Sequence, residues 1–203
     1  MSDWRDALTL QADRFAEEYL RGLLSSLLGV EAEVRLLRER HPHLDQDRLV
    51  DRIVGDAVMR SGQLGAAVAL PTLLPFLGGA FLASTIVTDA TFLLREQLSM
   101  LIQLSYLYAP LRSRAEREVE AVELYARFAS PDDTPTTPTP ALAGHIARTT
   151  FKHVARRVLR NVWRKRISQW IAIPASLIIS AKVNRSATSE LGLFAALELR
   201  RAQ

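Results

Sequence analysis

The chain has 203 residues, of which 48% are hydrophobic and 24% are charged, and it contains no cysteine. This length suits one domain with a single core, and the composition excludes a disordered chain. The absence of cysteine excludes a disulfide scaffold, cysteine-ligated zinc and thiol chemistry. Frequent Leu, Ala, Arg and Glu residues predict an all-α fold, and no α/β alternation is visible.

The net charge of +4 is unevenly distributed along the chain. Residues 1–60 carry 9 Lys or Arg and 12 Asp or Glu, whereas residues 141–203 carry 12 Lys or Arg and only 2 Glu. The basic charge therefore lies in the C-terminal third, which indicates an anionic partner near that segment. Phospholipid headgroups, nucleic acid and the chain's own acidic helices are the three candidates.

The N-terminal part is predicted to form three helices. The apolar residues of 3–28 recur at intervals of three, four or seven, which is typical of an amphipathic helix. The same residues lack the basic region followed by an apolar region that a secretory signal requires. A second helix over residues 31–40 should stop at His41-Pro42. Asp45 is then expected to cap the N-terminus of a third helix.

Residues 65–88 hold no charged side chain, and this length is sufficient to cross a bilayer. Two prolines and a Gly-Gly pair within residues 71–79 interrupt the stretch, so it is not predicted to be one helix. One helix should end at about residue 70, and another should run from Ala80 to about Tyr108. A further helix is expected over residues 111–129.

Residues 130–140 contain four prolines among Thr and Asp, which predicts an extended linker. The linker separates residues 1–129 from a basic C-terminal part over residues 141–203. Three helices are predicted in that part, over residues 142–170, 171–182 and 186–201. We therefore expect residues 1–203 to form a single-domain helical bundle of about 7–9 helices around a central apolar helical hairpin.

The predicted helix over residues 142–170 combines an apolar side with many cations. A helix lying at a membrane surface needs an apolar strip in the acyl boundary, cations over anionic headgroups and tryptophan at the border. Each cation near an anionic surface contributes about 1 kcal/mol. The candidate contacts to a membrane or another anion are Arg148, Lys152, Arg156, Arg157, Arg160, Trp163, Arg164, Lys165, Arg166 and Trp170.

Two alternatives to membrane contact apply to this basic helix. Its apolar side could pack on the core while its cations are solvated. Its charge could also bind nucleic acid without sequence preference, although no recognised DNA- or RNA-binding motif is present.

Asp89 interrupts an apolar environment, and a buried carboxylate is costly unless it is paired or hydrogen-bonded. We expect it to find a partner in Arg95, Arg60 or a helix N-terminus, in a structural rather than a catalytic role. An alternative function uses Asp89 together with Asn184. These two polar residues could line a ligand-binding or enzymatic pocket between the apolar helices.

Metal and catalytic motifs are weak in this sequence. The metal-binding residue types in residues 41–47, HPHLDQD, span a proline turn and overlap the predicted helix cap. No nucleophile elbow, phosphate loop, HExxH zinc motif or glycine-rich dinucleotide turn is present. No catalytic residue, cofactor or metal is therefore predicted, and the chain is expected to be non-enzymatic.

Two segments resemble the bacterial EcsC-like family. The run LPTLLPFLGGAFLASTIVTDATFLLREQLSMLIQLSYLYAP resembles the family's central part, and IAIPASLIISAKVNRSATSELGLFAALELRR resembles its C-terminal signature. Together the similarity covers roughly residues 50–110 and 165–200. The matching positions are Pro71, Asp89, Tyr108, Pro174, Asn184, Thr188, Gly192 and Ala196.

The chain departs from the family at Ala109-Pro110, where the family commonly has a glycine after the tyrosine. The resemblance implies an all-helical bacterial protein from a family named by association with a membrane transporter operon. It carries no catalytic residues to transfer to this sequence.

These features together favour a cytoplasmic helical protein that meets a membrane surface, or a membrane protein complex, through its basic helix. Its expected partner is anionic phospholipid or a membrane protein, in a peripheral position on the inner face of the membrane. The apolar segments over residues 65–88 and 167–181 are expected to pair as the central hairpin. The second segment is shorter than the roughly 20 residues that cross a bilayer, so burial in the core is favoured over insertion.

Overall fold

A computed structural model describes residues 18–69, 79–129 and 173–202 of the chain. Its description of side chains excludes those of residues 64–69, 79–90, 129 and 173–180. Every regular element within the described ranges is a helix, which confirms the all-α prediction. The predicted linker over residues 130–140 and the predicted basic helix over residues 142–170 lie outside the described residues.

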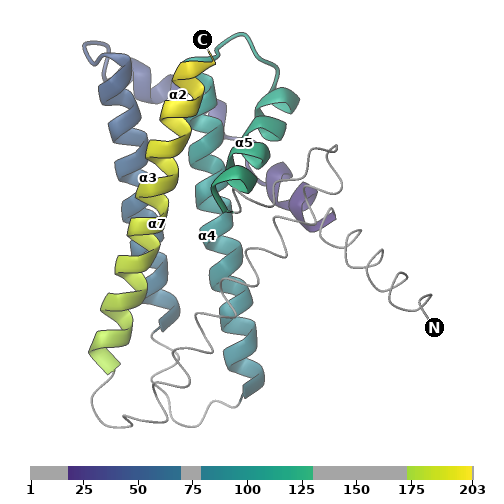
Figure 1. Ribbon diagram of the computed structural model, residues 1–203, viewed down its shortest axis with the longest axis vertical. Helices are drawn as coiled ribbons and strands as arrows, with labels where there is room; N and C mark the ends of the chain where they lie inside the picture. Colours follow the sequence, from purple (N-terminus) through teal and green to yellow (C-terminus); the bar gives the residue numbers. More distant parts are fainter. Residues whose placement is uncertain (1–17, 70–78, 130–172, 203) are drawn as a thin grey trace, which may run out of the picture.

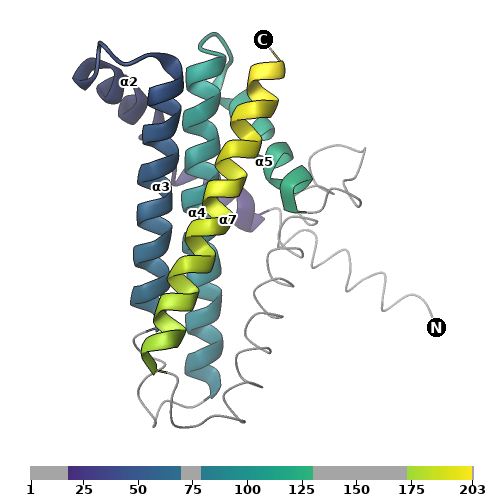
Figure 2. The same ribbon diagram turned by 60° about the vertical axis from the view of Figure 1, so that its left-hand side comes forward.

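Three long helices form the body of the fold and lie side by side in both views (Figures 1 and 2). A helical segment over residues 18–25 and the short α2 precede them, and α5 packs against α4 near the end of the bundle where α2 lies. The elements are α2 (Val30–Arg40), α3 (Gln46–Ala69), α4 (Gly79–Tyr108), α5 (Arg114–Ala129) and α7 (Ile173–Arg201).

The starts of α3 and α5 follow local capping signals. Oδ1 of Asp45 accepts the backbone N–H of Arg48 at 2.8 Å, which confirms the predicted cap of α3. At α5, Ser113 Oγ accepts the backbone N–H of Glu116 at 3.3 Å, and Glu116 Oε2 accepts the backbone N–H of Ser113 at 2.7 Å. This reciprocal capping box begins α5 at Arg114, three residues after the predicted start.

The C-terminal region corrects one prediction. Separate helices over residues 171–182 and 186–201 were expected, but α7 is one helix from Ile173 to Arg201. The predicted gap contains neither proline nor glycine, so the backbone can continue as a helix. Asn184 and Thr188 are both fully buried on one side of α7, and this packing outweighs the weak helix propensity of the Ser/Thr-rich sequence.

The helix α7 runs antiparallel to α3 and in the same direction as α4 (Figure 1). The helices α3 and α7 approach each other closely at Gly192, where an added Cβ would lie 2.8 Å from both Cγ atoms of Val54. Glycine at this position allows the two helices to pack closely. Three contacts set the register of α3 against α7: Asp47 with Arg200, Val54 with Gly192, and Gly62 with the side chain of Arg185.

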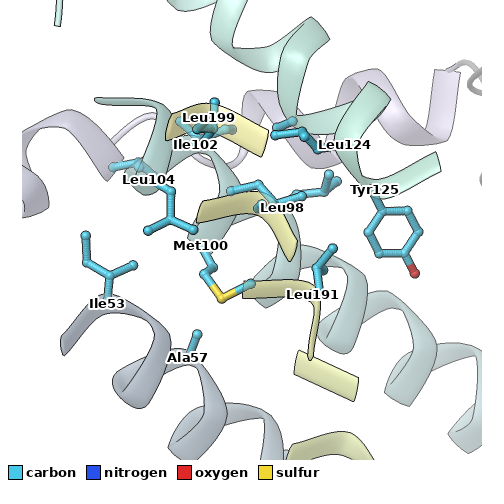
Figure 3. Packing of buried hydrophobic residues seen from close by; sticks show 14 of the residues in the cluster. Ile53, Ala57, Leu98, Met100, Ile102, Leu104, Leu124, Tyr125, Leu191 and Leu199 are labelled. Carbon is cyan, nitrogen blue, oxygen red and sulfur yellow. The ribbon is translucent and has the colours of Figure 1, made fainter. Parts of the chain in front are cut away.

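Among the described side chains, the buried core lies where α3, α4, α5 and α7 meet, in the half of the bundle next to α2 and α5. Leu98, Leu101 and Leu104 of α4 are completely buried there. Figure 3 shows side chains of all four helices in this cluster, with Leu98, Met100, Ile102 and Leu104 of α4 among Ile53, Ala57, Leu124, Tyr125, Leu191 and Leu199. This core accounts for the association of the helices in that half.

The described helices also bear on membrane crossing, over which the sequence favours burial of the apolar segments. Within residues 18–69, 79–129 and 173–202, none of the helices combines the length and the hydrophobicity that a bilayer crossing requires.

Candidate functional site

The predicted membrane-contact residues cannot be placed by the structure. All of them fall between residues 130 and 172, outside the described residues. They are Arg148, Lys152, Arg156, Arg157, Arg160, Trp163, Arg164, Lys165, Arg166 and Trp170. Their assignment therefore rests on the sequence.

The structure places Asn184 in a buried polar layer between the three long helices. Asn184 and Thr188 are one turn apart on α7, and neither is exposed to solvent. Gln97 of α4 donates from Nε2 to Thr188 Oγ1 at 3.3 Å. From α3, the buried Ser61 donates from Oγ to the carbonyl of Val58 at 3.0 Å. One level of the bundle thus collects polar groups from α3, α4 and α7.

This polar layer fits a packing role. It consists of amide and hydroxyl side chains, which neither ionise near neutral pH nor act as a general base. Buried hydrogen bonds of this kind select one helix register, because a shifted register would leave the same groups unpaired.

Asp89 lies on α4 about two turns from Glu96, and its side chain is outside the described part of the chain. The two arginines expected to pair with it both contact Glu96. Nε of Arg60 lies 2.8 Å from Glu96 Oε2, and Nη1 of Arg95 lies 3.5 Å from Glu96 Oε1. The contact between Arg60 and Glu96 links α3 to α4.

Sequence reasoning missed Glu96 as the centre of this cluster. The only charged residues between positions 61 and 110 are Asp89, Arg95 and Glu96, so all three stand out in an apolar region. Glu96 could have been singled out by the same signal as Asp89. The choice of Arg60 as its partner depends on the α3/α4 register, which the sequence does not show.

Arg117 organises the turn between α4 and α5. Its guanidinium is buried and donates from Nη2 to the carbonyls of Ala109 at 2.7 Å and Pro110 at 2.9 Å. The charge therefore lies at the C-terminal end of α4, where the helix dipole favours a cation. The guanidinium carbon also lies 3.7 Å from the centroid of the Tyr106 ring, a cation–π geometry.

Tyr106 connects this turn to α2. Its hydroxyl donates to Glu31 Oε2 at 3.2 Å. Burial raises the pKa of Tyr106, and the nearby Glu31 carboxylate raises this pKa further. The phenol therefore stays neutral and can keep donating this hydrogen bond.

Glu120 of α5 also forms polar contacts at this turn between α4 and α5. It accepts a hydrogen bond from Ser105 Oγ at 2.6 Å, and it pairs with Arg112. The hydrogen bond to Glu120 raises the pKa of Arg112, so the guanidinium stays charged. Both contacts hold α5 and its preceding turn against α4.

A cleft of about 240 Å³ lies between α5 and α7. Two arginines in its wall share one acid, since Glu198 is 3.0 Å from Arg127 and 2.9 Å from Arg201. Neither Asp89 nor Asn184 lines this cleft, which is formed by Glu120, Leu124, Arg127, Glu198, Leu199, Arg201 and Ala202. The cleft thus lends no support to a ligand pocket built on Asp89 and Asn184.

The segment over residues 41–47 has structural roles. Asp45 caps α3, and Asp47 pairs with Arg200 at the far end of α7. His41 and His43 lie edge to face with ring centroids 6.4 Å apart. A search of the described residues finds no group of three or more histidines and acids arranged to hold a metal.

Comparisons of this chain with protein-family models, with curated proteins and with solved structures return no match.

Proposed function

We propose that this protein attaches to an anionic membrane surface through the basic segment formed by residues 148–166. The observation that carries the proposal is the charge of this segment, which holds eight Lys or Arg and no Asp or Glu. Its apolar positions Phe151, Val154 and Val158 recur at helical spacing, and Trp163 follows them. An interfacial helix requires this combination of cations, apolar strip and tryptophan.

Pairing of the basic segment with the chain's own acids is the main alternative. Several acids of the described bundle are already neutralised by cations from outside the segment. Glu96 pairs with Arg60 and Arg95, and Asp47 pairs with Arg200. Three more acids are paired in the same way: Glu118 with Arg114, Glu120 with Arg112, and Glu198 with Arg127. This internal pairing supports an external anion as the partner.

The expected partner is anionic phospholipid or a membrane protein, with the protein lying on the inner face of the membrane. We further propose that the chain shares the architecture of the EcsC-like family. Its complete fold would then contain about 7–9 helices around a central hairpin of residues 65–88 and 167–181. In this arrangement the protein has a binding rather than an enzymatic role.

Flotation with lipid vesicles tests this function. The purified chain is mixed with vesicles of phosphatidylcholine, or of phosphatidylcholine and phosphatidylglycerol, at low and at high salt. A variant with Arg156, Arg157, Arg160, Arg164, Lys165 and Arg166 changed to Gln serves as the comparison. We expect wild type to float with anionic vesicles at low salt, and both high salt and the variant to weaken flotation, because the attraction is electrostatic.

The proposal would be contradicted if the wild-type chain floated under none of these conditions. Retention on DNA or RNA with a steep loss at raised salt would assign the basic segment to nucleic acid instead. Flotation that survives both high salt and the six substitutions would move the membrane contact to the apolar helices.

A further inference from the structure

One end of the three-helix bundle carries no charged residue, and we call it the uncharged end. It consists of residues 64–69 of α3, 79–88 of α4 and 173–181 of α7. Figure 1 shows that α3 ends where α4 and α7 begin, at the end of the bundle opposite α2 and α5. The second view shows the same arrangement (Figure 2).

The charges next to this end begin at nearly the same level on two helices. Gln97 of α4 contacts Thr188 of α7, so Asp89 lies level with about residue 180 of α7. Lys182, the first charged residue of α7, is therefore within one turn of that level. The cluster of Arg60, Arg95 and Glu96 lies about two turns further from the uncharged end.

The length of the uncharged end matches half of a bilayer. From Asp89 back to Gly79, α4 rises about 15 Å, and from Lys182 back to Ile173, α7 rises about 14 Å. The hydrocarbon core of a bilayer is about 30 Å thick, so one leaflet contributes about 15 Å. The described parts of these helices are long enough to fill one leaflet.

The bundle also connects this end directly to the basic segment. Arg166 is separated by only six residues from Ile173, where α7 begins at the uncharged end. Cations and an uncharged helical end are therefore neighbours along the chain. A protein that rests in one leaflet needs this order, with apolar residues among acyl chains and cations at the headgroups.

We propose that the uncharged end inserts into the acyl region of one leaflet, with Asp89 and Lys182 at the headgroup boundary. The occupant of this surface is lipid acyl chain. The proposal rests on the proposed function in that the basic segment brings the bundle to the membrane. Its own evidence is different, namely the placement of three uncharged helix ends at one end of the fold.

Single-cysteine labelling can locate the uncharged end, because the natural chain contains no cysteine. Leu82→Cys and Leu177→Cys place an environment-sensitive NBD fluorophore in the uncharged end, and Glu39→Cys places it on the exposed face of α2 as the control. The vesicles contain phosphatidylcholine and phosphatidylglycerol, with or without bromine on the acyl chains. If Leu82→Cys loses its helical circular dichroism signal, Ser84→Cys is used in its place. Ser180→Cys likewise replaces Leu177→Cys.

We expect the labels at positions 82 and 177 to shift their emission to the blue on vesicle binding and to lose intensity with brominated lipid. The label at position 39 should do neither. If the labelled protein floats with vesicles but the labels at positions 82 and 177 show neither a blue shift nor quenching, insertion is overturned and surface attachment stands. If no labelled protein floats, both proposals fail. Quenching that persists in the variant with six Gln substitutions supports insertion and removes the basic segment from attachment.

Discussion

The two ends of the three-helix bundle differ in their charged residues. At the end next to α2 and α5, buried and half-buried ions are paired, as Arg117 is with the carbonyls of Ala109 and Pro110 and Glu120 is with Arg112. At the uncharged end, the same three helices carry no ion at all. The end next to α2 and α5 forms ion pairs and hydrogen bonds of its own. The three helices at the uncharged end have only backbone, apolar and hydroxyl groups. This contrast agrees with the proposed position of the bundle at the boundary between water and lipid.

The largest expected effect comes from the core at the charged end. Leu104→Ala removes a completely buried side chain, so the free energy of unfolding should fall by about 2–5 kcal/mol. Leu193→Ala is the matched control, because Leu193 is 59% exposed and its truncation should change stability little. Urea denaturation followed by circular dichroism measures both. Equal losses of unfolding free energy in the two variants would show that the core does not lie in the half of the bundle next to α2 and α5.

The contact between α3 and α7 should be nearly as sensitive. Gly192→Ala places a Cβ 2.8 Å from both Cγ atoms of Val54, so it should destabilise the fold by about 1–3 kcal/mol. Gly55→Ala is the control on the exposed side of α3, where no atom lies within 4 Å of the new Cβ. That change should stabilise the helix by about 0.5–1 kcal/mol. Thermal or urea unfolding that ranks the two variants in the opposite order would refute the α3/α7 register.

The buried polar layer between the two ends can be tested by a double-mutant cycle. Thr188→Val leaves the Gln97 amide without this acceptor, which should cost about 1–3 kcal/mol. Gln97→Leu combined with Thr188→Val removes donor and acceptor together and should cost less than the two single changes added. Additive losses in urea denaturation would show that the pair contributes no coupling.

The smallest effect concerns pH and the α5 cap. Hydrogen bonds from the Ser113 hydroxyl and backbone N–H lower the pKa of Glu116 below its unfolded value of about 4.3. The carboxylate therefore contributes stability that is present above that unfolded value and is lost as pH falls through the folded pKa. Glu116→Gln should lower stability at neutral pH, with the difference from wild type shrinking in acid. Urea denaturation across this pH range would contradict the cap if the difference stayed constant.

Local signals explain which parts of the fold could be predicted from the sequence. The cap at Asp45 and the end of α4 before Pro110 both follow from residues next to the boundary. The continuity of α7 could not be predicted in this way. It depends on burial of Asn184 and Thr188 against other helices, which is a tertiary effect.

In the candidate site, too, some features follow from the sequence alone and others depend on how the helices pack. The basic segment and the uncharged stretches are visible as composition, so the sequence alone identifies them. Their spatial relation depends on the directions of α3, α4 and α7, which bring three uncharged segments to one end. The contacts of Arg60 and Arg95 with Glu96 depend likewise on helix register.

Vesicle binding by two matched α7 variants tests the contrast between the ends most directly. Ser176→Arg places a cation in the uncharged end, and Ser186→Arg places the same cation on an exposed position of the same helix. An arginine in the acyl region costs about 2.5–3.5 kcal/mol, so Ser176→Arg should weaken binding to anionic vesicles by at least tenfold. Ser186→Arg should bind as tightly as wild type or slightly more tightly. Binding of Ser176→Arg at the wild-type level, with its fold intact by circular dichroism, would contradict the account.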